Sequence, residues 1–461
     1  MPNERLHFIG IGGAGMSALA HWFLAHGAHV SGSDAKDSPT LHRLAQAGAV
    51  VHVGHDARHL GAVDRVVYSA AIPAENPELV EAKRRGLPLI SRAALLGEVL
   101  ARHVGIAIAG THGKTTTTAM TAAIFLAAGR DPTILLGGDW EPIGGNVRVG
   151  GSDLCIVEAC EAFNSFLELR PHHAAVTNID ADHLEFHGDL DGVKDAFARF
   201  LAARQAGGVA VICLDDPHAR AVAERAAAPL LGYGIDSLDA DLRAFRVEVG
   251  PAASRFRVTY RGTSLGAVRL TVPGLHNVRN ALAAIGLALV MEVPFDAVQT
   301  GLATFRGVGR RFERLGEVGG VLVIDDYAHH PTEIVATLAS ARTAYPERRL
   351  WAVFQPHLYS RTQRLMDEFA RALAGADRVL VTEIYAAREP PIPGVTGEAL
   401  AEATRALAGA ERVAFAADLA AGAEYLRQAV APGDLVLVMG AGDVRHLGES
   451  LVHSLTRGAK N

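Results

Sequence analysis

Two glycine-rich loops, each between an apolar run and a helical stretch, constrain the fold of this chain more than any other feature. The first loop, GIGGAG over residues 10–15, follows the apolar run 6–9 and opens a stretch with apolar residues at helical spacing. The second, GTHGKTT over residues 110–116, follows the apolar run 104–109 and opens a run of threonines. A strand, a tight glycine turn and a helix in this order are typical of βαβ units on a parallel sheet. The sequence therefore predicts an α/β protein in which this plan begins twice.

Three domains are expected from the length and from the order of the strand-like runs. The chain has 461 residues, and a domain usually takes about 150. Strand-like and helical stretches alternate, restart at residue 104 and continue in the last third. We expect a Rossmann-like N-terminal domain over 1–103, a central P-loop-type ATPase domain with a mixed sheet over 104–312, and a Rossmann-like C-terminal domain over 313–461.

Composition and charge exclude several classes of protein. Apolar residues make up 49% and charged residues 20%, which is ordinary globular usage. The net charge of -6, with no long basic patch, argues against nucleic acid or an anionic membrane as a partner. The three cysteines lack CxxC spacing, which argues against a disulfide framework and a structural zinc site. Since no basic leader and no run of about 18 apolar residues is present, we expect a soluble cytoplasmic protein.

The first loop has the spacing of a dinucleotide-binding turn. Gly10, Gly12 and Gly15 match GxGxxG, in which missing side chains let backbone N–H groups approach a diphosphate at a helix N-terminus. Asp34 ends the next strand-like run, where a carboxylate can accept a ribose hydroxyl. Taken alone, the loop favours a nicotinamide dehydrogenase, and a tight turn without a ligand stays an alternative. The motif indicates a diphosphate and does not specify NAD.

The second loop indicates a nucleoside triphosphate. Its N–H groups can hold phosphates, while Lys114 reaches the transferring phosphoryl group and Thr115 meets magnesium. The loop is shorter than GxxxxGK, because Ile108 stands where that motif needs glycine. A dehydrogenase has no use for a second phosphate loop. Two such loops favour an ATP-driven, magnesium-assisted reaction that joins a nucleotide-linked substrate to something else.

Further candidates lie at the ends of the strands that follow. Glu158 closes the run LCIV and has the place of a Walker-B-type acid, so we interpret it as a metal ligand. His183 in NIDADH is either a ligand or a capping or core histidine, and the neighbouring Asp180 and Asp182 are either ligands or solvated acids.

Two motifs near the end of the central domain leave two interpretations each. In GLHNVRN the polar residues open a helix, where asparagine amides either read an adenine edge or cap the helix: His276, Asn277 and Asn280. In GRRFER, Arg310 and Arg311 lie at the expected hinge, where a guanidinium either moves onto the γ-phosphate or stays a solvated charge.

In the last domain, charged and imidazole groups follow the apolar runs and so gather at one sheet edge, which indicates substrate contacts: Asp325, Asp326, His329, His330, His357 and Arg361. All three domains can present ligand loops in this way. We therefore expect the active site in a cleft between them.

The motifs together resemble the Mur ligase family over the whole chain. The matching segments include FIGIGGAGMSALA, GTHGKTTTT, VTNIDADHLE, PGLHNVRNALAA, DDYAHHPTEI and FQPHLYSRT. The resemblance implies a cytoplasmic, three-domain ligase that uses ATP and Mg²⁺. ATP would phosphorylate the lactyl carboxylate of UDP-N-acetylmuramate, and the amine of L-alanine would attack the acyl phosphate. The first glycine loop would then hold the uridine diphosphate end of the substrate instead of NAD.

The resemblance also assigns roles to residues that match the family motifs. Those for ATP are Gly110, Thr111, His112, Gly113, Lys114, Thr115 and Thr116 for the phosphates, His276, Asn277, Asn280 and Asp325 for the rest of the nucleotide, and Arg310 or Arg311 for the γ-phosphate. Those for magnesium are Thr115, Glu158 and His183.

For the other two substrates the resemblance implies a second set. The nucleotide-sugar residues are Gly10, Gly12, Gly13, Ala14, Gly15, Asp34 and Ser69. Arg361 of the last domain is a further substrate residue, in the group that would place the amino acid and the acyl phosphate, and the candidates for deprotonating the amine are His329 and His330.

Some positions depart from the family pattern. The chain reads EACEAF where relatives often read EADESD, which changes residues 160, 162 and 163. Leu358 stands where many relatives carry arginine, and Phe197 stands about where other members have a carbamylated lysine, so we expect no such modification. Within the same class, a ligase that recycles a preformed tripeptide is the alternative. From a different class, the NAD-dependent dehydrogenase stays an alternative.

Overall fold

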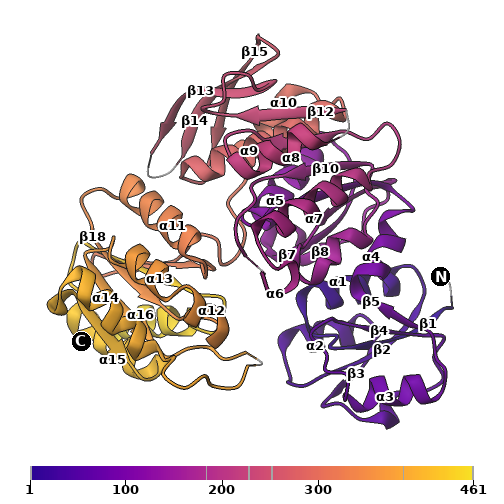
Figure 1. Ribbon diagram of the computed structural model, residues 1–461, viewed down its shortest axis with the longest axis horizontal. Helices are drawn as coiled ribbons and strands as arrows, with labels where there is room; N and C mark the ends of the chain where they lie inside the picture. The colour runs from indigo at the N-terminus through magenta and orange to yellow at the C-terminus, as the bar shows by residue number, and fades with distance from the viewer. Residues whose placement is uncertain (1–2, 183, 227–228, 251–252, 388, 459–461) are drawn as a thin grey trace. The chain divides into compact units, whose positions relative to one another are not determined.

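The computed structural model describes residues 3–182, 184–226, 229–250, 253–387 and 389–458 (Figure 1). Its strands form three sheets, each with helices around it, which confirms the predicted α/β class. The chain divides into two compact units. The first unit comprises Met1–Val247, Arg255–Leu270 and Asn277–Arg306, and the second comprises Glu248–Ser254, Thr271–His276 and Gly307–Asn461.

The N-terminal sheet has five parallel strands in the order β3-β2-β1-β4-β5, which is the order of a Rossmann half. Its strands are β1 (Arg5–Ile9), β2 (His29–Asp34), β3 (Val50–Val53), β4 (Arg65–Tyr68) and β5 (Leu89–Ser91). Its helices are α1 (Ala14–Ala25), α2 (Pro39–Gln46), α3 (Pro77–Arg84) and α4 (Arg92–Leu100), with a short 3-10 turn, η1 (Ala57–His59).

The middle sheet has ten strands in the order β15-β14-β13-β12-β11-β10-β6-β9-β7-β8. It is mixed, as predicted, since β8 pairs antiparallel with β7 while β6 pairs in parallel with β9 and β10. Its strands are β6 (Val104–Ala109), β7 (Thr133–Trp140), β8 (Gly145–Arg148), β9 (Leu154–Glu158), β10 (His173–Val176), β11 (Ala210–Cys213), β12 (Leu230–Gly234), β13 (Leu242–Val249), β14 (Ser254–Tyr260) and β15 (Thr263–Leu270).

Helices accompany this sheet along the chain. They are α5 (Lys114–Ala127), α6 (Leu184–His187), α7 (Leu190–Ala202), α8 (Pro217–Arg225), α9 (Leu275–Val290) and α10 (Phe295–Thr304), with 3-10 turns η2 (Glu141–Ile143) and η3 (Ala162–Glu168). One buried apolar cluster runs from the first sheet into the second, and includes Phe8, Trp22, Leu100, Phe166 and Phe200. This continuous core explains why both sheets fall in one compact unit.

The C-terminal sheet has the order β16-β17-β21-β18-β19-β20, with β16 antiparallel at its edge and the others parallel. Its strands are β16 (Glu313–Val318), β17 (Val321–Asp326), β18 (Arg349–Phe354), β19 (Arg378–Thr382), β20 (Val413–Ala416) and β21 (Asp434–Met439). Its helices are α11 (Pro331–Ala344), α12 (Tyr359–Arg364), α13 (Met366–Leu373), α14 (Gly397–Ala408), α15 (Leu419–Ala429) and α16 (Arg445–Gly458), with one 3-10 turn, η4 (Ala410–Arg412).

The three sheets correspond to the three expected domains, while the boundaries at 103/104 and 312/313 stay predictions. Across the described residues, none of the helices combines the length and the apolar character needed to span a bilayer.

Candidate active site

The second glycine loop lies between β6 and α5 and accepts no side chain at either glycine. Gly110 and Gly113 have φ values of +139° and +82°, in the region that favours glycine. A Cβ on Gly110 would overlap Thr177 Oγ1, and one on Gly113 would lie 2.5 Å from Asn280 Oδ1. The loop backbone is therefore packed directly against the segment after β10 and against α9.

The segment after β10 fixes the backbone of His112. His112 N donates to Asn178 Oδ1 at 2.9 Å, while Asn178 Nδ2 and Thr177 Oγ1 donate to the His112 carbonyl at 3.0 and 2.6 Å. His112 Nε2 lies 3.3 Å from Asp180 Oδ2. The sequence analysis missed Thr177 and Asn178, although both follow a strand that is the parallel neighbour of β6.

The start of α5 offers a set of phosphate donors. Its N-cap residue, Gly113, has no capping side chain, and the first helical bond runs from Thr117 N to the Gly113 carbonyl at 2.9 Å. The N–H groups of Lys114, Thr115 and Thr116 therefore have no carbonyl within the helix. Such N–H groups, together with the helix dipole, favour an anion at this end.

Lys114 is held inside this loop by a buried acid. Its Nζ donates to the carbonyls of Gly110 and Thr111 at 2.6 and 3.0 Å, and to Glu161 Oε2 at 2.9 Å. Burial opposes the charge of Lys114, but the Glu161 carboxylate outweighs that effect and raises the pKa of the ammonium above its ordinary value. Lys114 is therefore a cation at any physiological pH. Glu161 stands in EACEAF, where the sequence alone predicted no role for it.

Glu158 ends β9, the strand next to β6, as predicted. In register it pairs with Ile108, two residues before the loop. Its Oε1 accepts from Gly137 N at 2.6 Å, and a Cβ on Gly137 would lie 2.6 Å from Oε2. Together with the buried Thr115 it supplies hydroxyl and carboxylate oxygens, which is the donor chemistry that Mg²⁺ prefers. His183, the third predicted ligand, lies outside the described residues.

The first glycine loop joins β1 to α1 and is shaped by the end of β2. The Ser33 carbonyl accepts from Gly10 N and Ile11 N at 2.8 and 2.9 Å, and Asp34 Oδ2 accepts from Gly12 N at 2.9 Å. Asp34 thus fixes the loop itself, a contact that the sequence analysis did not foresee. Its predicted contact with a ribose stays a prediction.

These contacts leave the N-terminal N–H groups of α1 for a ligand. The helix begins after Gly13, which has no capping side chain, and its first backbone bond runs from Ser17 N to the Gly13 carbonyl. The N–H groups of Ala14, Gly15 and Met16 therefore have no carbonyl within the helix. The loop predicted to bind a diphosphate thus has the donors that a diphosphate needs.

An arginine that the sequence analysis missed lies over this loop. A Cβ on Gly15 would lie 2.8 Å from Arg92 Nη1, so the guanidinium lies against the glycine backbone. Arg92 is the first residue of α4, and no ion pair to it is present among the described residues. The signal was present in SRAALL, where an arginine follows a strand at the carboxyl edge of the sheet.

Arg92 also lines a hollow of about 510 Å³ within the first unit. The lining includes the predicted substrate residue Ser69 and the three positions that depart from the family pattern, Cys160, Ala162 and Phe163. Arg199 adds a second positive charge to the wall. Arg92 and the residues on either side of the Lys114 partner, Glu161, therefore line the same hollow.

The predicted nucleotide residues lie at the start of α9. Asn277 and Asn280 are buried, and Asn280 Nδ2 donates to Asn277 Oδ1 at 3.3 Å. Since Asn280 also lies against Gly113, the structure brings it to the phosphate loop. His276 Nδ1 lies 3.4 Å from Ser340 Oγ on α11, so it belongs to the second unit.

In the second unit, the two predicted arginines lie beside the same tyrosine but differ in their hydrogen bonds. Both guanidinium groups lie 4.8 Å from the ring centroid of Tyr327. Arg310 Nη2 also donates to the carbonyls of Gly440 and Gly442 at 2.7 and 3.0 Å. For Arg311, the described residues supply neither an ion pair nor a hydrogen bond to the guanidinium. Arg311 is therefore the one with donors available for a phosphate.

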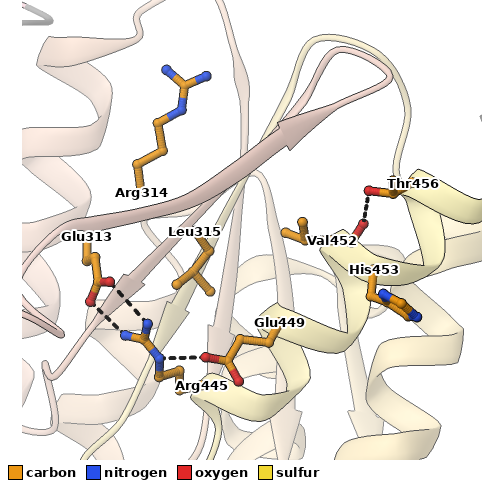
Figure 2. A pocket seen from close by; sticks show the side chains of 8 residues that line it. All are labelled: Glu313, Arg314, Leu315, Arg445, Glu449, Val452, His453 and Thr456. Carbon is orange, nitrogen blue, oxygen red and sulfur yellow. Dashed lines mark hydrogen bonds and ion pairs between the residues drawn. The ribbon is translucent and has the colours of Figure 1, made fainter.

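Asp325 is completely buried and serves an ion-pair network. Arg445 at the start of α16 donates to Asp325 Oδ2 at 3.0 Å and to Glu313 at 2.6 Å. Figure 2 shows Arg445 between Glu313 and Glu449, in the wall of a hollow of about 390 Å³ between β16 and α16. Asp325 is thus engaged by Arg445 on the protein side, and its contact with a nucleotide stays a prediction.

The other predicted residues gather at the carboxyl edge of the C-terminal sheet, as expected. Asp326 accepts from Phe312 N and Ala328 N at 2.8 Å each, and burial raises its pKa to about 6. His329 Nδ1 lies 3.2 Å from Glu333 Oε2 and its ring is partly exposed. His330 and Arg361 are buried.

Comparison with known families and proteins gives a consistent result. Three family models match the chain: the Mur ligase family catalytic domain over residues 5–104, the Mur ligase middle domain over 108–288, and the Mur ligase glutamate ligase domain over 310–442. The UDP-N-acetylmuramate–L-alanine ligase of Trichlorobacter lovleyi is 47% identical over 453 residues, which are 98% of this chain and 99% of the relative. The enzyme of the same name from Geobacter sulfurreducens is 46% identical over 98% of each chain.

Solved structures agree in fold. A UDP-N-acetylmuramate–alanine ligase from Thermotoga maritima matches with a TM-score of 0.84 and 29% identity, covering 98% of this chain and 99% of that one. A murein peptide ligase from Psychrobacter arcticus matches with a TM-score of 0.74 and 27% identity over the same shares of the two chains. These matches confirm the three-domain α/β architecture that the sequence predicted.

Proposed function

This chain belongs to the Mur ligase family, and we propose that it joins L-alanine to the lactyl carboxylate of UDP-N-acetylmuramate at the expense of ATP. The observation that carries the proposal is a pair of uncapped helix N-termini in one chain, at α1 and α5. Arg92 accompanies the first and Lys114 the second. One suits a nucleotide-linked diphosphate and the other a triphosphate. The identity of 46–47% with two alanine ligases over nearly the whole chain supports the choice of substrates.

The reaction needs an activated carboxyl group, because a carboxylate is a poor electrophile. The lactyl carboxylate would attack the γ-phosphorus of ATP, so that ADP leaves and an acyl phosphate forms. The amine of L-alanine would then attack the acyl carbon, phosphate would leave with the former carboxylate oxygen, and the amine would lose a proton. The first N–H groups of α5 would hold the transferring phosphoryl group. Lys114 would exchange one of its contacts in the loop for a phosphate oxygen and offset the charge of the phosphoryl group.

Mg²⁺ bound by Thr115 and Glu158 would supply further positive charge at the phosphates. For the proton of the amine, His329 is better suited than His330, since its ring is partly exposed while His330 is buried. Arg311 would bind the γ-phosphate, because the guanidinium of Arg310 already bonds two carbonyls.

The test is phosphate release from ATP with Mg²⁺ and UDP-N-acetylmuramate, measured with L-alanine, with the tripeptide L-Ala-γ-D-Glu-diaminopimelate and with no acceptor. Release that requires L-alanine supports the proposal. Release with the tripeptide alone would mean that the chain catalyses the recycling reaction. That reaction is the alternative, since the chain is also similar to a murein peptide ligase. No release with either acceptor would overturn both.

A further inference from the structure

We propose that Glu78, a buried carboxylate outside the predicted active site, is a positioning residue for the nucleotide-sugar substrate and acts through Ser33. The inference rests on the proposed function, because it takes the loop of residues 10–15 as the diphosphate site. Its test separates the two proposals.

Glu78 lies near the start of α3 with its side chain completely buried, and histidines from β1, from η1 and from the loop between β3 and η1 surround it. His55 Nδ1 lies 3.0 Å from Oε2, and His59 Nδ1 lies 3.0 Å from Oε1. His7 on β1, also completely buried, has Nε2 at 3.4 Å from Oε1. Burial of an ionised carboxylate is costly unless donors surround it, and this cluster supplies them.

The remaining side-chain contact of Glu78 is with Ser33, which lies next to the loop of residues 10–15. Ser33 is the second-last residue of β2, directly before Asp34. Its Oγ donates to Glu78 Oε2 at 2.5 Å and lies 2.9 Å from His55 Nδ1. The hydroxyl is fully buried, so Glu78 fixes both its rotamer and the position of the strand end. The acid thus holds a serine whose backbone carbonyl bonds the glycine loop.

The backbone of Ser33 shapes the diphosphate loop directly. Its carbonyl accepts from both Gly10 N and Ile11 N, and the next residue, Asp34, accepts from Gly12 N. Three consecutive loop N–H groups therefore take their positions from residues 33 and 34. A displacement of this strand end would turn the N–H groups of α1 away from the diphosphate, and a loss of that alignment weakens binding.

The experiment measures binding and kinetics in two variants, Glu78→Gln and Ser33→Ala. Glu78→Gln keeps the shape and removes the charge, while Ser33→Ala removes the link and leaves Glu78 with its histidines. We expect both to raise the Kd for UDP in calorimetry and the KM for UDP-N-acetylmuramate by about tenfold. The kcat and the KM values for ATP and L-alanine should stay close to those of the wild type, because their sites do not depend on this strand end.

Leu79→Ala is the matched control. Leu79 is the next residue of α3 and is also buried, but it packs in the apolar cluster with Ile9, Leu60 and Val66. This variant should lower Tm without changing the Kd for UDP. A KM for UDP-N-acetylmuramate that rises equally in Leu79→Ala would reduce Glu78 to a structural residue and overturn the inference.

The remaining outcomes are also decisive. If the wild type binds UDP-N-acetylmuramate and Ser33→Ala binds it equally well, the inference fails and the proposed function stands. If the wild type binds neither UDP nor UDP-N-acetylmuramate, the proposed function itself fails. Should Glu78→Gln not fold, Ser33→Ala alone still decides, because it leaves the carboxylate and its imidazole donors in place.

Discussion

Lys114 of the phosphate loop lies 2.9 Å from Glu161, a carboxylate whose side chain is only 2% exposed, so the loop carries its own counter-ion. The pair is fixed on both sides, because Lys114 Nζ also donates to two loop carbonyls. A cation with so many acceptors holds one position. This geometry holds the positive charge of Lys114 in one place at the N-terminus of α5.

The first prediction concerns this pair. Lys114→Ala should lower kcat at least about a thousandfold, because the transferring phosphoryl group loses its cation. Glu161→Gln should raise the KM for ATP about tenfold and lower kcat less, because Lys114 keeps its bonds to two loop carbonyls but loses its charged partner. Steady-state kinetics with varied ATP measures both effects, and circular dichroism checks that the fold is intact. Full turnover by Lys114→Ala would mean that this loop does not bind the phosphates of ATP.

The two arginines beside Tyr327 should separate in their effects. Arg311→Ala should lower kcat by about a hundredfold, because its guanidinium would bind the γ-phosphate. The Tm should change little, because that guanidinium makes no hydrogen bond to the described residues. Arg310→Ala should lower Tm by a few degrees, since it releases the carbonyls of Gly440 and Gly442. Kinetics and thermal unfolding of both variants provide the comparison. The reverse assignment would follow if Arg310→Ala lost turnover while keeping its Tm and Arg311→Ala did not.

Arg92 should contribute to binding of the nucleotide sugar. Because its guanidinium lies over Gly15, Arg92→Ala should raise the Kd for UDP about ten- to a hundredfold, and Arg92→Lys should restore part of that loss. Isothermal calorimetry with UDP measures the effect apart from turnover. Arg85→Ala is a control, because Arg85 lies at the end of α3 and pairs with Glu81. Equal losses of affinity in both variants would point to a general charge effect.

The buried His173 predicts a loss of stability in acid. Burial, with help from His172 and Arg204, lowers its pKa to about 4, and Val209 N donates to its Nδ1 at 3.1 Å. The folded form is therefore neutral, while the unfolded chain takes up a proton below its ordinary pKa of 6.5. The contribution is complete above pH 6.5 and is lost as the pH falls to about 4, by on the order of 3 kcal/mol.

Unfolding of wild type and His173→Asn at several pH values measures this contribution. Asparagine can accept from Val209 N but does not titrate, so the variant should lose less stability between pH 6.5 and 4 than the wild type does. Parallel slopes in that range would show that His173 is protonated in the folded protein.

The thiols should resist alkylation. Burial raises the pKa of Cys155 to about 12 and that of Cys213 to about 11, and burial together with Glu161 raises the pKa of Cys160. Since the thiolate is the nucleophile, iodoacetamide at pH 8 should label the native chain slowly and label all three residues after unfolding. Mass spectrometry of the peptides identifies the sites. Fast labelling of Cys160 alone would mean that the hollow beside it opens to solvent.

Local patterns predicted many of the parallel strands and the loops after them. The runs before both glycine loops became β1 and β6, and the helices after them begin within the loops, because a buried parallel strand is almost continuously apolar. Several strands were not predicted, namely β3, β7, β8, β11, β12 and β16. Of these, β8 and β16 are antiparallel edge strands without a fully buried residue, so their sequences carry little apolar signal.

The site residues divide in a similar way. Lys114 and Glu158 were found because phosphate loops and strand ends have recognisable spacing. Arg92 and Glu161 were missed because their roles depend on which chain segments meet in space, and no spacing along the sequence encodes that. Asp34 was predicted to be a site residue from its position at the end of a strand. Its contact with Gly12 N could not be predicted, because it depends on how the strand and the loop meet in space.

The helix that carries the phosphate donors begins with a poor sequence for a helix. Thr115 to Thr118 are consecutive β-branched residues, and the hydroxyls of Thr118 and Thr121 donate back to the carbonyls of Lys114 and Thr117. Such a segment gains little helix as an isolated peptide, so its helicity depends on burial against the middle sheet. During synthesis, the chain should therefore acquire affinity for ATP only after β10 and the segment that follows it have been made and β10 has paired with β6. Nucleotide binding by nascent chains of increasing length would report the chain length at which these strands of the middle sheet have paired.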